Sequence, residues 1–216
     1  DGITNLTILS DDASGLRSGP YNVDGYTPGT LGETSITNCG DISINSYENS
    51  IRSLGDVLID NVDSVSLISS DNRGMMVGPG DSDTQDTGAM GSVVISNVET
   101  FEIESYYDGI KAIGDLTVEN VGTFTIVCDD NSGLRIGPTQ NRQTAANGDI
   151  TITDCGTLDI DAYDNAIRAM GDLYMENVTN IDVTSQNRNG FRVGLGDEEI
   201  ITDNHPIKMT ILTQNR

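Results

Sequence analysis

The chain has 216 residues, with 34 acidic side chains against 11 Lys and Arg, and its formal net charge is −23. A surface this negative repels phosphate backbones, which excludes general nucleic-acid binding. No apolar run approaches the roughly 18 residues of a membrane span. The one histidine, His205, lies beside Pro206 near the C-terminus, which argues against a Ser-His-Asp enzyme.

An internal repeat organises the chain. A partial turn occupies residues 3–20, and six turns follow that begin at Glu33, Asp56, Ser92, Asp115, Asp149 and Asp172. Two kinds of turn alternate, and each holds about 23 residues with three short runs of alternating apolar side chains. A last alternating run covers residues 207–212. The pattern predicts an all-β fold, a single parallel β-helix domain over residues 1–216 with seven to eight coils and three strands per coil.

Equivalent residues should stack on neighbouring coils about 4.8 Å apart. Three such columns are expected. The apolar column holds Leu6, Ile42, Val65, Phe101, Phe124, Leu158 and Ile181, and the small column holds Ser10, Ser46, Ser69, Ser105, Cys128, Ala162 and Ser185. The asparagine column occupies a turn where stacked amides can form hydrogen bonds along the helix axis, and it holds Asn38, Asn61, Asn97, Asn120, Asp154 and Asn177. Every second coil should carry an inserted loop, within residues 19–32, 78–91, 137–148 and 194–204.

The three cysteines are expected to be free and buried. Cys39 and Cys155 occupy equivalent positions four coils apart, or roughly 19 Å, whereas a disulfide needs Cα atoms within about 7 Å. Cys128 lies in a different column, and the spacing of the three matches no zinc motif.

The outward position of the third strand gathers six of the eleven cationic residues. We call Arg17, Arg52, Met76, Lys111, Arg135, Arg168 and Arg192 the basic column. Unit charges about 4.8 Å apart repel by about 0.9 kcal/mol in water, so anionic groups are expected beside it. Two interpretations stay open: an acidic polysaccharide lying along the helix axis, or internal neutralisation by the acids of the neighbouring turns.

Those acid-rich turns are also candidate calcium sites. The candidate ligands are Asp71, Asp108, Asp129, Asp130 and Asp164. Calcium takes six to eight oxygen ligands, and carboxylates on adjacent coils can supply several of them. Because the sequence has no EF-hand loop, solvated surface acids are the alternative interpretation.

A column of tyrosines follows the second strand on alternate coils. Tyr47, Tyr106 and Tyr163 should lie two coils apart, near 10 Å, and we call them the tyrosine column. Aromatic faces at that interval suit alternate sugars of an extended glycan. The alternative is that each ring covers the edge of the core at a corner.

Three linked segments resemble a known family: AIRAMGDLYMENV at residues 166–178, GIKAIGDLTVENV at 109–121 and SIRSLGDVLIDNV at 50–62. They are similar to secreted, pectate-lyase-like β-helix proteins of the carbohydrate-binding type found in cellulolytic clostridia. The resemblance covers most of residues 3–194. It implies an extracellular, right-handed β-helix that binds calcium and cellulose or acidic plant polysaccharide. The long double repeat with regular insertions departs from the shorter coils of that family.

Neither end of the helix shows a polar cap in the sequence. Gly2 and Ile3 align with Asn120 and Val121, so the chain should begin inside a coil, and residues 207–212 should add one more strand. Open edges pair with other chains, which predicts head-to-tail stacking into a filament. The residues expected at that contact are Ile3, Leu6, Ile207, Met209 and Ile211. The alternative is that the ends are trimmed or are capped by residues outside this chain.

Three classes of function therefore compete. The first is a non-catalytic extracellular matrix or cell-surface protein that stacks end to end and binds acidic polysaccharide and calcium. The second is a monomeric carbohydrate-binding module. The third is a polysaccharide lyase, which is disfavoured because an active site normally interrupts a repeat and Met76 is the one interruption visible in the basic column.

Overall fold

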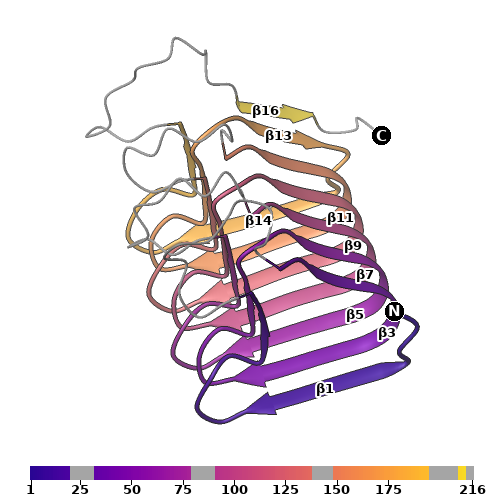
Figure 1. Ribbon diagram of the computed structural model, residues 1–216. Helices are drawn as coiled ribbons and strands as arrows, with labels where there is room; N and C mark the ends of the chain where they lie inside the picture. The colour runs from indigo at the N-terminus through magenta and orange to yellow at the C-terminus, as the bar shows by residue number, and fades with distance from the viewer. Residues whose placement is uncertain (20–31, 79–90, 138–147, 195–208, 213–216) are drawn as a thin grey trace.

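The computed structural model describes residues 1–19, 32–78, 91–137, 148–194 and 209–212, and these form a parallel β-helix (Figure 1). The strands are β1 (Asn5–Ser10), β2 (Leu16–Ser18), β3 (Thr34–Ser46), β4 (Ile51–Ser53), β5 (Val57–Ser69), β6 (Met75–Val77), β7 (Val93–Ser105), β8 (Ile110–Ala112), β9 (Leu116–Cys128), β10 (Leu134–Ile136), β11 (Ile150–Ala162), β12 (Ile167–Ala169), β13 (Leu173–Glu176), β14 (Asn180–Ser185), β15 (Phe191–Val193) and β16 (Met209–Leu212). The predicted all-β parallel solenoid is confirmed.

Two parallel sheets run the length of the helix. The first joins β1, β3, β5, β7, β9, β11, β13 and β16 in that order, with β14 also paired to β11. The second joins the seven short strands from β2 to β15. Each coil thus pairs only with the coils before and after it, and Figure 1 shows the coils stacked from β1 at one end to β16 at the other.

The first two of the three predicted strands of a coil are continuous in β3, β5, β7, β9 and β11. Each of these strands bends at one residue of the asparagine column, where φ lies between 53° and 54°. Asn and Asp tolerate this left-handed conformation better than other side chains, so the chain turns a corner while its pairing continues. Hydrogen bonds between side-chain amides connect the corners of adjacent coils; for example, Asn120 Nδ2 donates to Asn97 Oδ1 at 2.8 Å.

The apolar column fills the core as the repeat predicts. Phe101 pairs with Val65 on one side and Phe124 on the other, and the two rings stack with centroids 5.1 Å apart. Both rings are fully buried. Burial of one such side chain contributes about 1.5–3 kcal/mol, so the repeated column is a main source of stability.

Side chains of the small column form hydrogen bonds that stabilise the corner between the long and the short strands. Ser46 donates to the carbonyl of Glu48 at 3.0 Å, and Ser105 donates to that of Tyr107 at 3.2 Å. Cys128 occupies the same column and is buried. These inward hydroxyls hold the turn backbone close to the core, which fixes where the outward side chains of the turn emerge.

All three cysteines are free and buried, as predicted. Burial raises the pKa of the Cys128 thiol to about 12 and that of Cys155 to about 11. These thiols are therefore protonated and act as core side chains.

The short strands β2, β6, β10 and β15 lead to Gly19, Gly78, Gly137 and Gly194, each with φ between 91° and 105°. These glycines mark the predicted start of an insertion on every second coil. The insertions themselves lie almost wholly outside the described residues.

The last alternating run adds one more strand, because β16 pairs in parallel with β13. Met209 lies opposite Leu173, and Ile207 is outside the described residues. Among the residues that the structure describes, no helix is long and apolar enough to cross a membrane.

Candidate ligand-binding face

The basic column exists as a continuous register. Pairing runs through Arg17–Arg52, Arg52–Met76, Met76–Lys111, Lys111–Arg135, Arg135–Arg168 and Arg168–Arg192. On β10 the neighbours of Arg135 are Leu134 and Ile136, both fully buried, so the arginine points away from the core. The short strands thus align six cationic side chains and Met76 on one face along the helix axis.

The members of the basic column differ in exposure. Arg17 is exposed, and Arg135, Arg168 and Arg192 are partly exposed. Lys111 is only 1% exposed, although it occupies the outward position of β8. Its ammonium is therefore not presented to solvent in the way that the predicted ligand-binding role requires.

Arg52 is engaged by the backbone. Its Nη1 donates to the carbonyls of Ser53 and Gly78, both at 2.8 Å, and to that of Met76 at 3.3 Å. These carbonyls lie where two adjacent coils leave their short strands. Arg52 therefore joins the coils of β4 and β6, and its predicted role in ligand binding has a structural role beside it.

A cluster of charges interrupts the repeat at the centre of the basic column. Asp108 is fully buried, and its Oδ2 accepts from Nε of Arg73 at 2.8 Å. Nη1 of Arg135 lies 3.9 Å from the same oxygen. The guanidinium of Arg73 also lies 5.9 Å from the ring centre of Tyr107. The neutralisation proposed as one interpretation of the column thus occurs here between side chains of three successive coils.

Sequence reasoning missed Arg73, although a signal was present. Equivalent turns hold Ser14, Ser132 and Asn189 at its position, and Asn49 and Asn165 stand at the position of Asp108. The next residue of the basic column after Arg73 is Met76, whose sulfur lies 3.7 Å from Arg73 Nη1. In this coil the cation, Arg73, lies three residues before the position of the basic column, and its acidic partner, Asp108, lies on the next coil along the chain.

The tyrosine column lies at the corner between the long and short strands. Tyr47, Tyr106 and Tyr163 are 47%, 41% and 40% exposed. The backbone N–H of Asp130 donates to the Tyr106 carbonyl at 2.9 Å, so the turns of adjacent coils are stacked. The Tyr106 ring meets Tyr107 edge to face, with centroids 4.9 Å apart.

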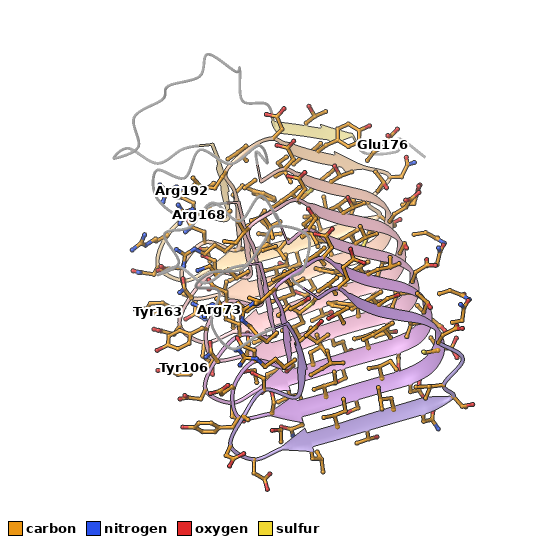
Figure 2. All side chains as sticks on the ribbon, in the orientation of Figure 1. Arg73, Tyr106, Tyr163, Arg168, Glu176 and Arg192 are labelled. Atoms are coloured by element: carbon orange, nitrogen blue, oxygen red, sulfur yellow. The ribbon has the colours of Figure 1, made fainter. Side chains whose placement is uncertain are left out.

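Smaller polar residues alternate with these tyrosines. Ser70 and Asp129 follow the ends of β5 and β9, where the coils between those of the tyrosine column reach the same corner. The rings therefore project on alternate coils, about 10 Å apart. Figure 2 shows Tyr106 and Tyr163 on the same side of the molecule as Arg73, Arg168 and Arg192, with Glu176 on the opposite side. A linear molecule along this edge would meet aromatic and cationic groups at each double repeat.

The predicted calcium ligands are divided by the structure. Asp71, Asp129 and Asp130 are exposed, whereas Asp108 is buried against Arg73. Asp164 Oδ1 forms an ion pair with Arg188, whose Nε lies 3.2 Å away, and it accepts a hydrogen bond from the Asn187 amide at 3.1 Å. Within the described ranges, no three His, Cys, Asp or Glu side chains are grouped so that they could hold a metal ion. The described carboxylates alone do not fit a calcium site, and calcium binding stays a prediction.

Comparison with family models, curated proteins and solved structures finds no match to this chain. The family resemblance noted in the sequence therefore remains a prediction.

Proposed function

We propose that this chain is a non-catalytic, extracellular β-helix protein that binds an acidic polysaccharide along the edge formed by the tyrosine column and the basic column. The observation that supports this most directly is the row of three half-exposed tyrosines on alternate coils. Tyrosine is amphipathic: its ring face suits the apolar face of a sugar, and its hydroxyl can bond to sugar hydroxyls. An extended glycan repeats along its length as the coils do.

The acidic character of the proposed ligand follows from the adjacent charges. Arg168 and Arg192 are partly exposed and lie on the side of the molecule that carries Tyr163 (Figure 2). Guanidinium groups bind carboxylates strongly and with defined geometry, which favours a polymer that contains uronic acids. The protein as a whole carries a charge of −23, so this binding depends on local charges and weakens as salt rises.

Catalysis is not part of the proposal. A general base has to reach the proton that it removes. At the interruption of the repeat, Asp108 is fully buried and is bound by Arg73, and Lys111 is 1% exposed. The interruption is accounted for by a structural ion pair, and the polysaccharide lyase stays the less favoured alternative.

The test is binding of polygalacturonate by two double variants. Tyr106→Ala with Tyr163→Ala removes two aromatic faces, and we expect at least about a tenfold loss of affinity, which corresponds to about 1.4 kcal/mol. Arg168→Gln with Arg192→Gln should weaken binding at low salt and flatten its salt dependence.

The matched control is Tyr174→Ala, because Tyr174 lies on β13 and bonds there to Glu176, on the opposite side from the tyrosine column. This variant should bind as the unmodified chain does. If neither double variant changes the affinity, or if the unmodified chain does not bind polygalacturonate, the proposal is wrong. Circular dichroism of each variant confirms that the fold is kept.

A further inference from the structure

We infer that the ligand of this face is a glycan in which uronic acids alternate with neutral sugars. Because it concerns the edge formed by the tyrosine column and the basic column, this assignment rests on the proposed function. Two coils span about 10 Å, which is close to the length of one disaccharide in an extended glycan. Successive sugars can therefore lie over successive coils, so a difference between alternate coils selects a different sugar for each.

On the coils of the tyrosine column, the corner turn between the long and the short strand holds one acidic side chain, and each is bound by another side chain. Oγ of Ser14 donates to Glu48 Oε2 at 3.1 Å. Asp108 is fully buried in the ion pair at the centre of the basic column. Asp164 Oδ1 lies 3.2 Å from Nε of Arg188. The acids beside the tyrosines thus have partners within the protein, and for Asp108 and Asp164 that partner is a cation.

The coils between them carry exposed carboxylates at the same corner. Asp71 follows the end of β5, and Asp129 and Asp130 follow the end of β9. The backbone N–H of Asp71 donates to the Tyr47 carbonyl and that of Asp130 to the Tyr106 carbonyl, both at 2.9 Å. Each of these acids therefore lies on the coil directly after a tyrosine. Along the edge, aromatic rings and exposed carboxylates alternate with the period of the double repeat.

The two kinds of coil suit different sugars. An ionised carboxylate accepts hydrogen bonds and donates none, so the exposed acids fit the hydroxyl groups of a neutral sugar. They repel the carboxylate of a uronic acid placed one coil spacing away. Over the coils of Tyr106 and Tyr163 the corner acid is paired with an arginine, so a uronic acid fits there. Arg168 lies on the coil of Tyr163 and is partly exposed, which places a guanidinium group near that sugar.

The basic column supports the same assignment. On the coil of Asp71 its member is Met76, which carries no charge. On the coil of Asp129 its member is Arg135, whose Nη1 lies 3.9 Å from Asp108 Oδ2 on the preceding coil. The column therefore has no cation on one of the coils between the tyrosines, and on the other its cation is shared with a carboxylate of the coil of Tyr106.

The test is isothermal titration calorimetry of the full 216-residue chain with three oligogalacturonates of equal length. In the first every sugar has a free carboxylate, in the second free carboxylates alternate with methyl esters, and in the third every carboxylate is esterified. We expect the alternating oligomer to bind most tightly, at least about threefold more tightly than the fully acidic one. In the corner variant Asp71→Asn, Asp129→Asn, Asp130→Asn, the fully acidic oligomer should gain at least about threefold in affinity, and the preference for alternation should be lost.

The matched control is Asp63→Asn, Glu99→Gln, Glu119→Gln, which removes the same number of charges from exposed acids beside the asparagine column. It should keep the preference for the alternating oligomer. Affinity that simply rises or simply falls with the number of free carboxylates would overturn the assignment, and so would a corner variant that behaves as the control does.

Failure of the proposed function gives a different result. In that case no oligomer with free carboxylates binds, or the tyrosine and arginine double variants bind as the unmodified chain does, and the assignment of an alternating glycan falls with it. Circular dichroism verifies that both triple variants keep the fold.

Discussion

The ion pair between Arg73 and Asp108 allows a test in which the repeat itself supplies the substitutions. Arg73→Ser installs the residue found at Ser14 and Ser132, and Asp108→Asn installs the residue found at Asn49 and Asn165. The double variant therefore restores the arrangement that the other coils already use. We expect each single change to destabilise the protein and the double change to recover most of the loss.

The magnitudes follow from burial. Asp108 is fully buried, and the removal of one partner of a buried pair typically costs about 3–5 kcal/mol. Arg135 remains 3.9 Å away, so we expect Arg73→Ser to cost about 3 kcal/mol. In Asp108→Asn the unpaired group is Arg73, whose side chain is 17% exposed and can reach water, so a cost of about 1–2 kcal/mol is expected. The double variant should lie within about 1 kcal/mol of the unmodified protein.

Thermal melting by circular dichroism measures these differences. For a protein of this size 1 kcal/mol shifts Tm by about 2–4 °C, so Arg73→Ser should lower Tm by about 6–12 °C and the double variant by less than about 4 °C. The backbone N–H of Ser132 donates to Asp108 Oδ1, so its rate of hydrogen exchange reports how far each variant loosens the structure around Asp108. If the two single losses simply add in the double variant, the pair is not coupled and the reasoning fails.

Two further predictions concern the corner residues and the buried thiols. Asn120 has a φ of 53°, and its side-chain amide donates a hydrogen bond to Asn97. Replacement of Asn120 by Gly should lower the free energy of unfolding less than replacement by Ala, because only Ala adds left-handed strain of about 1–2 kcal/mol. Equal urea midpoints for the two variants would contradict this. The Cys128 and Cys155 thiols, with pKa values raised from 9.0 to about 12 and about 11, should resist iodoacetamide at pH 8 until urea unfolds the chain. Because the folded state raises the pKa of both thiols, the stability that they contribute is complete below pH 9 and is lost as pH rises towards 11–12. Between pH 9 and 12, Tm should therefore fall less steeply in a Cys128→Ala, Cys155→Ala variant than in the unmodified protein.

The coil and its columns could be predicted because a parallel β-helix places equivalent residues directly over one another. The alternation of Ile150 and Ile152 and the recurrence of Phe101 and Phe124 were enough to place the core. The asparagine column marked the corners for a related reason, since Asn and Asp accept the left-handed conformation found there. The continuity of β3 and its equivalents through that corner was not predicted, because a turn residue in a sequence ordinarily signals the end of a strand.

What the sequence determined by itself is the order of the columns: which residues share a face, including the seven positions of the basic column and the three tyrosines. Pattern alone specifies this, because strand pairing in register converts a repeat into a stack. Only the tertiary structure decided how each charge of that column is used. Arg52 donates hydrogen bonds to backbone carbonyls, Lys111 is buried, and Asp108 forms ion pairs with Arg73 and Arg135 of the neighbouring coils. Long side chains choose their partners from the acceptors and the water within reach, and those are known only once three coils lie on top of one another.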